Sequence, residues 1–238
     1  MYQDFHSHFN KDFSANTNLI NSQTCFSFHS KKDFLDFFNI FSGKNENIKV
    51  VLGVHPWYLD MNLLFFLESV LKNENTKIYG IGEVGFDFIK GDFSKNKALQ
   101  LEFFHYQLYL AEKYNLPLII HNLKGFHELA KYVKQLKKIK ACLFHGFSGS
   151  LQEAQFFLKQ DVNAFFSFGE NILFNRKKAI ECVNMLPVNR LGFETDGKNH
   201  ISIEKVFFKA KEIKNVTKEE DITIFHTEIK RNFNSIFT

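Results

Sequence analysis

Short apolar runs alternate with longer amphipathic stretches along most of this chain. Such alternation is typical of successive βα units, in which buried strands form a parallel sheet that helices cover. The apolar runs predict eight strands, over residues 2–8, 24–28, 49–55, 77–87, 117–121, 140–147, 163–168 and 191–196. Because no Pro-, Gly- or Ser-rich linker divides them, we expect one α/β domain over residues 1–238, folded as a (β/α)8 TIM barrel. A doubly wound open sheet is the alternative, because periodicity does not reveal closure.

Helical periodicity fills most of the gaps between these strands. It is clearest over residues 95–114, where a face is predicted from Leu99, Phe103, Tyr106 and Leu110. Further helices are predicted over residues 34–41, 63–71, 125–136, 150–159 and 176–186, with two more after the last strand. Residues 10–22 are Asn-rich and carry no helical stripe, so we expect a shortened first crossover or one without a helix.

Phenylalanine is the unusual component of the composition, with 31 Phe beside 7 Tyr and 1 Trp in 238 residues. Exposed rings beside a basic groove can stack on nucleic-acid bases, but such a site needs only a few of them. We therefore expect most phenylalanines to replace leucine and isoleucine in the core. The formal charge of +4 is mild and comes without basic clusters, so charge alone neither indicates nor excludes a nucleic-acid partner.

The three cysteines, Cys25, Cys142 and Cys182, are far apart and form no CxxC pair. This pattern argues against a disulfide framework and a thiolate zinc site, and it fits a reducing compartment. The sequence shows no signal-peptide pattern, and no apolar run reaches the roughly 18 residues of a membrane span. We expect a cytoplasmic protein that does not associate with membranes; a monomer fits, although the oligomeric state stays open.

Polar residues of the metal-binding type fall at or near the ends of the predicted strands. There are six of them: His6, His8, Glu83, His121, His145 and Asp196. The carboxyl ends of barrel strands meet on one face, where active sites are built. Residues two apart on a strand point the same way, so both imidazoles of the first strand are expected to face the barrel mouth. Imidazoles with carboxylates suit Zn, Mn, Ni or Mg.

The other histidines are less informative. His55 precedes Pro56 at the end of the third predicted strand and is expected on the same face of the barrel. Five more fall on predicted helices or loops, and we expect most of them to be solvent-exposed. These are His29, His105, His127, His200 and His226.

Six segments together resemble the ordered motifs of the TatD-type metal-dependent deoxyribonucleases, within the amidohydrolase-like barrels. They are residues 4–8 (DFHSH), 53–56 (GVHP), 81–87 (IGEVGFD), 119–121 (IIH), 144–150 (FHGFSGS) and 194–196 (ETD). Any one motif is weak, but six in order over nearly the whole chain are specific. The resemblance implies a TIM barrel with two divalent ions. One is held by His6, His8, Glu83 and Asp196, and Glu83 bridges to a second held by His121 and His145.

The resemblance also implies a reaction, the hydrolysis of DNA phosphodiester bonds. Exonuclease action is one form that this hydrolysis can take. The ions would be Mg, Mn, Zn or Ni, and they would activate a shared water. Asp196 is the expected catalytic group that orients this water or accepts its proton, and Glu83 fixes the separation of the ions. We expect His55 to bind substrate phosphate or support a ligand, and Asp87 to orient a ligand histidine.

The chain departs from the family pattern around the substrate pocket. After the histidine of the fifth strand the family commonly has Ser-Arg, whereas this chain has Asn122-Leu123 followed by Lys124. Lys124 is expected to bind substrate as a point charge, without the bidentate geometry of a guanidinium. Gly197 and Lys198 stand in a segment that is usually Ala-Pro-Tyr, and Gly146 stands where Cys is common.

Two other functions remain open at the level of the sequence. Relatives of the family are also associated with the removal of D-aminoacyl groups from tRNA, an ester hydrolysis that the same metal centre is able to perform. A barrel that binds metal or nucleic acid without turnover is the other alternative. The expected macromolecular partner is therefore DNA, or tRNA, as substrate.

Overall fold

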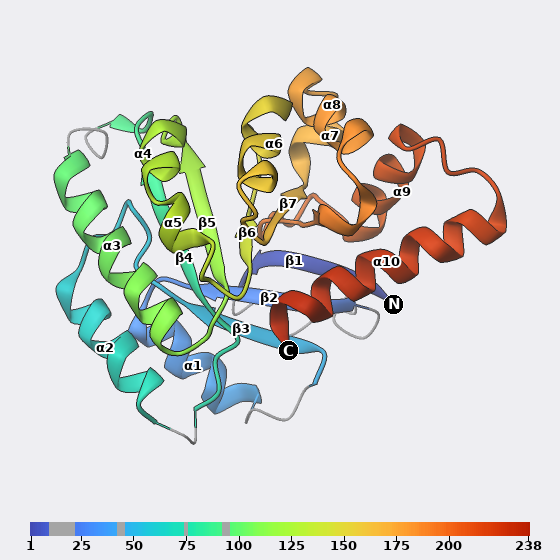
Figure 1. Ribbon diagram of the computed structural model, residues 1–238. Helices are drawn as coiled ribbons and strands as arrows, with labels where there is room; N and C mark the ends of the chain where they lie inside the picture. The colour runs from blue at the N-terminus through green and yellow to red at the C-terminus, as the bar shows by residue number, and fades with distance from the viewer. Residues whose placement is uncertain (10–21, 42–45, 74–75, 92–95) are drawn as a thin grey trace.

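The structure is a computed structural model that describes residues 1–9, 22–41, 46–73, 76–91 and 96–238. Its strands form one eight-stranded parallel sheet in chain order (Figure 1). They are β1 (Tyr2–His8), β2 (Ser22–Phe28), β3 (Ile48–Leu52), β4 (Gly80–Asp87), β5 (Leu118–Leu123), β6 (Cys142–Phe144), β7 (Ala164–Phe168) and β8 (Leu191–Phe193). All eight predicted strands are present, several of them shorter than predicted.

The sheet curls into a nearly closed barrel. The amide of Asp196, just beyond β8, donates a hydrogen bond to the carbonyl of His6 in β1 (3.0 Å). The carboxylate of Asp4 accepts hydrogen bonds from the amide (3.0 Å) and hydroxyl (2.6 Å) of Thr195. These bonds tie the last strand to the first, so the barrel prediction is confirmed and the open sheet is wrong.

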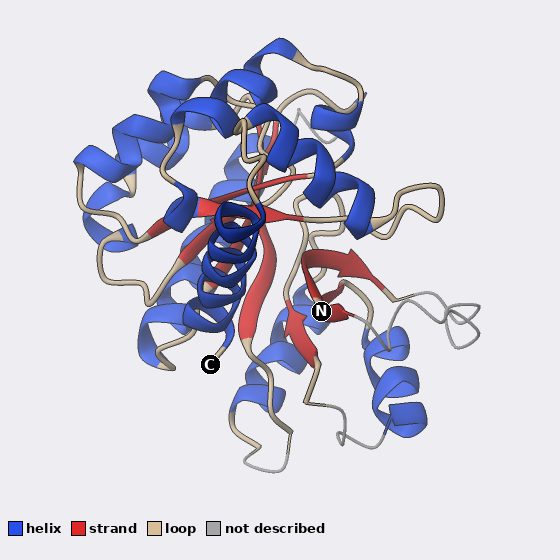
Figure 2. Ribbon diagram, turned by 90° about the vertical axis from the view of Figure 1, so that its right-hand side faces the viewer, coloured by secondary structure: helices blue, strands red, loops and turns tan. Residues whose placement is uncertain are grey.

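Helices surround the strands (Figure 2). They are α1 (Lys31–Phe41), α2 (Met61–Leu71), α3 (Lys97–Lys113), α4 (Phe126–Lys131), α5 (Val133–Leu136), α6 (Leu151–Lys159), α7 (Glu170–Leu173), α8 (Lys177–Met185), α9 (Ile203–Ile213) and α10 (Glu219–Phe237). The predicted helix 125–136 is two helices, and the short α7 was not predicted. The predicted shortening or loss of the first crossover helix concerns residues that lie outside the described ones.

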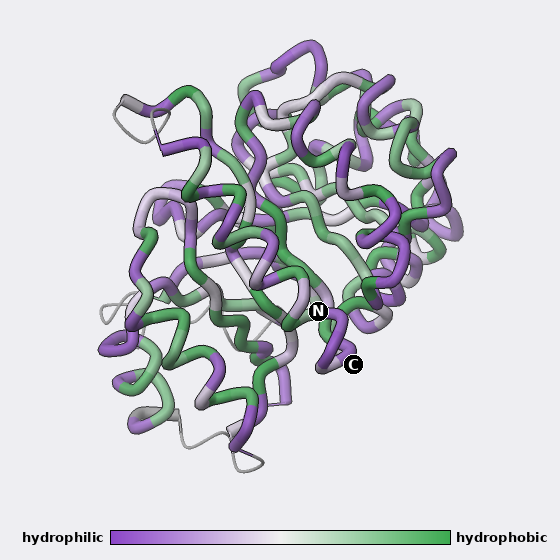
Figure 3. The backbone as a smooth tube through the Cα atoms, turned by 60° about the vertical axis from the view of Figure 1, so that its left-hand side comes forward, coloured by the Kyte–Doolittle hydropathy of each residue, from purple (hydrophilic) through white to green (hydrophobic). Residues whose placement is uncertain are grey.

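The core is built largely from phenylalanine, as predicted. Among the described residues, every one of the largest fully buried side chains is a phenylalanine. Phe144 and Phe166 stack with ring centroids 5.2 Å apart, and Phe5 packs edge-on against Phe233 at 5.3 Å. Figure 3 shows hydrophobic stretches gathered inside and hydrophilic ones on many outer turns.

The predicted apolar face of α3 is wrong in part. Leu99 is 39% exposed, whereas Gln100 and Gln107 are buried. The Gln107 side chain accepts a hydrogen bond from the amide of Val54 (2.7 Å) and donates one to its carbonyl (3.1 Å). Gln100 makes the same pair of bonds with the backbone of Asp87 (2.9 and 3.1 Å). The buried face therefore includes two glutamines that fasten α3 to the strand ends beside the barrel mouth.

Candidate metal centre

Glu83 is the middle of a polar cluster at the barrel mouth. It lies within β4, whose residues are all buried, and is itself only 2% exposed. The register of β4 against β5 shifts between Gly82 and Val84, at Glu83 itself. A similar shift between Asp4 and Ser7 in β1 contains His6. Such irregularities re-aim side chains, and here the side chains of Glu83 and His6 meet.

Three imidazoles face the first carboxylate oxygen of Glu83. His6 Nε2 and His8 Nε2 both lie 3.4 Å from Oε1, and His29 Nε2 lies 2.8 Å from it. His6 and His8 come from alternate positions of β1, as the HxH spacing predicts, and His29 directly follows β2. This side of the carboxylate therefore faces a nitrogen-rich cluster of donors.

Three more imidazoles face the second oxygen. The distances from Glu83 Oε2 are 2.5 Å to His145 Nε2 and 3.7 Å to both His55 Nε2 and His121 Nδ1. His121 Nδ1 and His145 Nε2 are 3.2 Å apart. One buried carboxylate thus lies between two histidine clusters, the arrangement that a bridge between two ions requires.

Asp196 adds a second carboxylate on the Oε1 side. Its Oδ1 lies 3.6 Å from His6 Nε2 and 3.5 Å from His8 Nε2, and its Oδ2 lies 3.3 Å from Lys198 Nζ. Asp196 stands three residues beyond the end of β8, in the left-handed region with φ of +55°, and Gly197 follows with φ of +66°. A Cβ on Gly197 would lie 2.8 Å from the Cβ of His8, so only glycine fits beside this ligand.

A buried carboxylate orients His121. His121 Nε2 lies 3.3 Å from Asp87 Oδ2, which also accepts a hydrogen bond from the indole of Trp57 (2.7 Å). The other carboxylate oxygen, Oδ1, accepts hydrogen bonds from the amides of Ile89 and Lys90. With its Nε2 held by Asp87, the ring turns its Nδ1 toward Glu83. Partners of this kind fix the tautomer and orientation of metal-binding histidines.

Glu194 supports His145, and sequence reasoning assigned it no role. Its Oε1 accepts a hydrogen bond from the amide of Gly146 (2.7 Å) and lies 3.7 Å from His145 Nδ1. Its Oε2 accepts a hydrogen bond from the hydroxyl of Ser167. Its position two residues before Asp196, at the end of a buried strand, was the available signal.

The protonation of the cluster favours metal binding. Burial lowers the pKa of His6, and it lowers the pKa of His55 to about 2, so both imidazoles are neutral. The lone pair of neutral His55 lies on Nδ1, which accepts a hydrogen bond from the amide of Trp57, so its Nε2 carries the proton on the side of Glu83. Burial opposes ionisation of Glu83, yet His145 and His6 hold its pKa well below the usual range. Burial also opposes a charge on His145, but Glu83 outweighs it and raises that pKa well above normal. A bound cation would replace the proton on His145, since metal binding releases protons.

Unpaired buried atoms give a direct test of the fit to a metal. His6 Nε2, both ring nitrogens of His29 and Glu83 Oε1 are buried without a hydrogen-bond partner among the described residues. Buried polar groups are rarely left unpaired, because each costs about 1–3 kcal/mol. Four sets of donor atoms lie within 4.8 Å of one another: His6–His8–Asp196, His6–Glu83–His145, His8–His29–Glu83 and His55–Glu83–His121. These residues fit divalent ions of the imidazole-binding type.

The structure brings together all six ligands expected from the sequence: His6, His8, Glu83, His121, His145 and Asp196. His55 is buried against Glu83, and its Nδ1 accepts a hydrogen bond from the amide of Trp57 (3.1 Å). Lys124 directly follows β5, where its side chain is exposed and its φ is +55°. The substrate-binding roles of His55 and Lys124 stay predictions.

His29 is an exception to the expectation that most of the five remaining histidines are solvent-exposed. Its side chain is 16% exposed and its ring reaches Glu83. The missed signal was its position: His29 directly follows the second predicted strand, the criterion that selected the other ligands. A cavity of about 350 Å³ opens beside it. It is lined by His8, Phe9, Ser27, Phe28, His29, Ser30, Asp33 and Tyr58.

A (β/α)8 barrel with a histidine and carboxylate cluster at its mouth defines the class of metal-dependent barrel hydrolases. Within that class, the chain belongs to the family described as TatD related DNase, which it matches over residues 2–238. In the part of the chain that the structure describes, no helix is both long enough and apolar enough to cross a membrane.

Curated relatives agree with this class. The chain is 33% identical over 170 residues to a protein of Haemophilus influenzae, an alignment covering 69% of this chain and 64% of the relative. It is 32% identical over 151 residues to YjjV of Escherichia coli, covering 61% and 56%. With YabD of Bacillus subtilis the identity is 33% over 204 residues, covering 78% and 77%. All three are described as uncharacterized metal-dependent hydrolases. The match thus spans less than two thirds of the first two relatives.

Solved structures agree with the fold. The crystal structure of the TatD homologue YjjV from Escherichia coli superposes with a TM-score of 0.84 at 24% identity, covering 99% of this chain and 97% of that one. A hydrolase of the TatD family from Entamoeba histolytica superposes with a TM-score of 0.76 at 19% identity, with the same coverage. At these identities the likeness concerns the barrel alone.

Proposed function

We propose that this protein hydrolyses phosphodiester bonds of DNA at a centre of two divalent ions bridged by Glu83. The observation that carries the proposal is the placement of one buried carboxylate between two groups of three imidazoles. In-line hydrolysis of a phosphodiester needs charge stabilisation at both the attacking and the leaving oxygen, and a bridged pair of sites supplies it.

The protein's own groups have separate tasks in this reaction. Bound ions would lower the pKa of a shared water and polarise a phosphoryl oxygen. Glu83 fixes the separation of the two sites, and Asp87 and Glu194 keep His121 and His145 turned toward it. Asp196 accepts the proton of the attacking water through Oδ1. Burial opposes ionisation of Asp196, but the hydrogen bond with His8 and the charges of His6 and His145 hold its pKa below the usual range, and Lys198 Nζ lies beside Oδ2.

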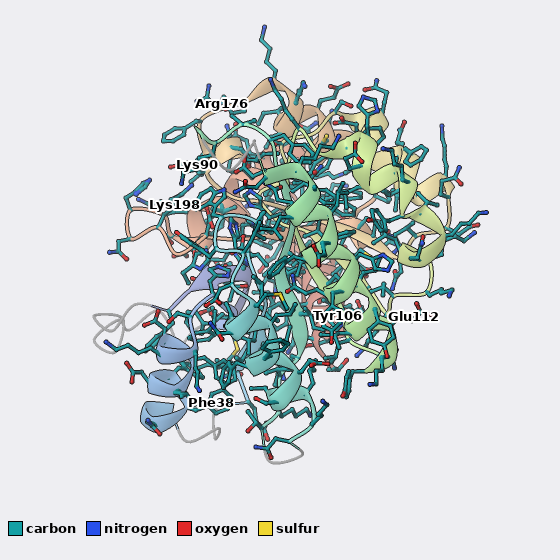
Figure 4. All side chains as sticks on the ribbon, turned by 90° about the vertical axis from the view of Figure 1, so that its left-hand side faces the viewer. Phe38, Lys90, Tyr106, Glu112, Arg176 and Lys198 are labelled. Atoms are coloured by element: carbon teal, nitrogen blue, oxygen red, sulfur yellow. The ribbon has the colours of Figure 1, made fainter. Side chains whose placement is uncertain are left out.

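Cations at the barrel mouth suit an anionic substrate. Lys90 Nζ lies 3.1 Å from the centre of the Trp57 ring. Lys198 Nζ lies between two carboxylates, 2.8 Å from Glu170 Oε2 and 3.3 Å from Asp196 Oδ2. Figure 4 shows Lys90 and Lys198 on the same side of the molecule. The exposed Tyr58 lines the cavity beside His29, and an exposed aromatic ring accommodates a nucleobase by stacking.

Glu83→Ala tests the proposal. Purified wild-type protein is incubated with labelled single-stranded DNA and Mg²⁺, Mn²⁺ or Zn²⁺, and again after chelation. We expect metal-dependent cleavage that chelation abolishes and that Glu83→Ala lowers by at least about 100-fold, because the bridge is lost. Glu112→Ala is the matched control, since Glu112 is exposed on α3 and pairs with Lys138 (Figure 4).

The same assay separates the alternatives. D-aminoacyl-tRNA is offered under the same conditions as the DNA. Turnover of that ester without cleavage of DNA would contradict the proposal in favour of a deacylase. No turnover of either substrate by a protein that holds metal would favour a binding barrel.

A further inference from the structure

His29 has the environment of a metal ligand. It lies at the carboxyl end of β2, where its ring is packed between those of His8 and His55, with centroids 5.2 and 5.1 Å away. Neither of its ring nitrogens has a hydrogen-bond partner in the described part of the chain, and both are buried. A structural histidine normally bonds at least one of them. The packing therefore leaves Nδ1 of His29 unpaired among the described residues, and it turns Nε2 toward the carboxylate of Glu83.

The distances around Glu83 Oε1 suit coordination. Donor atoms bound tetrahedrally at 2.0–2.1 Å from zinc lie about 3.3–3.4 Å from one another. His6 Nε2 and His8 Nε2 each lie 3.4 Å from Oε1, which matches this spacing, whereas His29 Nε2 lies closer, 2.8 Å from it. The atoms of His8, His29 and Glu83 are also within 4.8 Å of one another as a set. His29 is thus at least as close to Glu83 Oε1 as the two histidines of the HxH pair are.

Each carboxylate oxygen of Glu83 faces three imidazoles, of which the ligand set implied by the motifs includes two. On the Oε2 side these two are His121 and His145, and the third imidazole is His55, whose Nδ1 accepts a hydrogen bond from the amide of Trp57. On the Oε1 side the third imidazole is His29, and neither of its ring nitrogens has a hydrogen-bond partner among the described residues. The residue comes from a strand that contributes no ligand to that motif set.

We propose that His29 is a ligand of the ion bound at Glu83 Oε1, so that imidazole dominates the donor set on both sides of the bridge. Nitrogen donors suit Zn²⁺, Ni²⁺ or Fe²⁺, whereas Mg²⁺ prefers oxygen ligands and retained water. The centre therefore selects a nitrogen-preferring metal over Mg²⁺. The proposal rests on the same site as the proposed function, but it concerns metal binding alone and is tested without DNA.

Metal titration of variants tests the role of His29. Metal-free wild-type protein, His29→Ala and His29→Gln are titrated with Zn²⁺ against a chromophoric chelator, and with Co²⁺ while visible absorption is recorded. We expect His29→Ala to weaken the binding of one ion by at least about tenfold and to shift the Co²⁺ bands, since a nitrogen donor is lost. His127→Ala, on the exposed face of α4, should match wild type in both.

The variants give clear contrary outcomes. His29→Gln fills most of the same space with a poor ligand, so it tests the role even where His29→Ala fails to fold, and circular dichroism checks both. Wild-type Zn²⁺ affinity together with unchanged Co²⁺ bands in a folded His29 variant would overturn the assignment. Wild-type protein that binds Mg²⁺ more tightly than Zn²⁺ would overturn the stated selectivity. Loss of DNA cleavage is not a readout here, so failure of the proposed function is separately visible.

Discussion

At the residue scale, the centre depends on how closely the backbone brings its ligands together. Asp196 reaches His6 and His8 only because the chain leaves β8 through two successive left-handed residues. The second of them, Gly197, lies directly against His8, with 2.9 Å between a Cβ at Gly197 and the His8 amide nitrogen. Glycine at this position is therefore a steric necessity of this turn.

Gly197→Ala should damage the centre more than the fold. An alanine here meets both an unfavourable φ and the backbone of His8, so His8 or Asp196 must move. A displacement of about 1 Å at a reacting group can cost about 100-fold in rate. We expect about this loss in metal-dependent hydrolysis and a weaker affinity for one ion, measured by chelator competition.

Gly91→Ala is the control for that substitution. Gly91 also has a positive φ, of +48°, but within the described residues no atom lies within 4 Å of a Cβ placed there. Gly91→Ala therefore has the same kind of backbone strain as Gly197→Ala but not the contact with His8. Equal behaviour of the two variants would show that the contact with His8 is unimportant.

Most of the candidate ligands could be picked out from the sequence, because each lies in the carboxyl-terminal half of a predicted strand. His29 directly follows such a strand, but its neighbours resemble a loop and it belongs to no recognised motif. Glu194 could not be assigned a role for another reason. Its carboxylate contacts Ser167 and His145, which are far from it in the sequence, so no spacing in the sequence indicates the contact. Sequence periodicity reports which face a residue occupies and not which neighbour it meets.

At the element scale, α3 shows why a hydropathy pattern misplaces a face. Gln100 and Gln107 are buried, and their side chains bond the amide and the carbonyl of Asp87 and of Val54, respectively. Both backbone positions lie beside the candidate metal centre. A glutamine whose side chain bonds the backbone at a strand end is buried, but its low hydropathy predicts an exposed position. The strand pattern was predicted better, because β-strands buried on both faces form continuous apolar runs.

Gln107→Leu should destabilise the protein although it makes the helix more apolar. Leucine leaves the amide and carbonyl of Val54 buried and unpaired, which costs about 1–3 kcal/mol. Urea denaturation should show a loss of that size. Gln152→Leu, at an exposed position of α6, should change the free energy of unfolding by no more than about 0.5 kcal/mol. Equal stability of Gln107→Leu and wild type would contradict the anchoring role of this side chain.

At the scale of the whole molecule, the barrel gathers ligands from strands far apart in sequence. His6 and Asp196 meet because the bonds between β1 and the segment after β8 close the ring. Barrel closure was expected from the number of strands, but the sequence carries no direct mark of it. The same closure concentrates unpaired buried atoms at one point, as at His6 Nε2 and Glu83 Oε1. A divalent ion coordinated by these atoms would satisfy them together.

Removal of metal should lower the stability of the entire barrel. An ion that binds only the folded state at 100 times its dissociation constant stabilises it by about 2.7 kcal/mol. For a chain of this size that corresponds to about 5–11 °C in melting temperature. Scanning calorimetry of metal-free protein with and without added Zn²⁺ should show this rise, and Glu83→Ala should show little of it because both sites share Glu83. Glu112→Ala should retain the full rise. A wild-type melting temperature that is the same with and without ions would show that the unpaired ligands are tolerated without metal, and the centre would then not be the ion site described here.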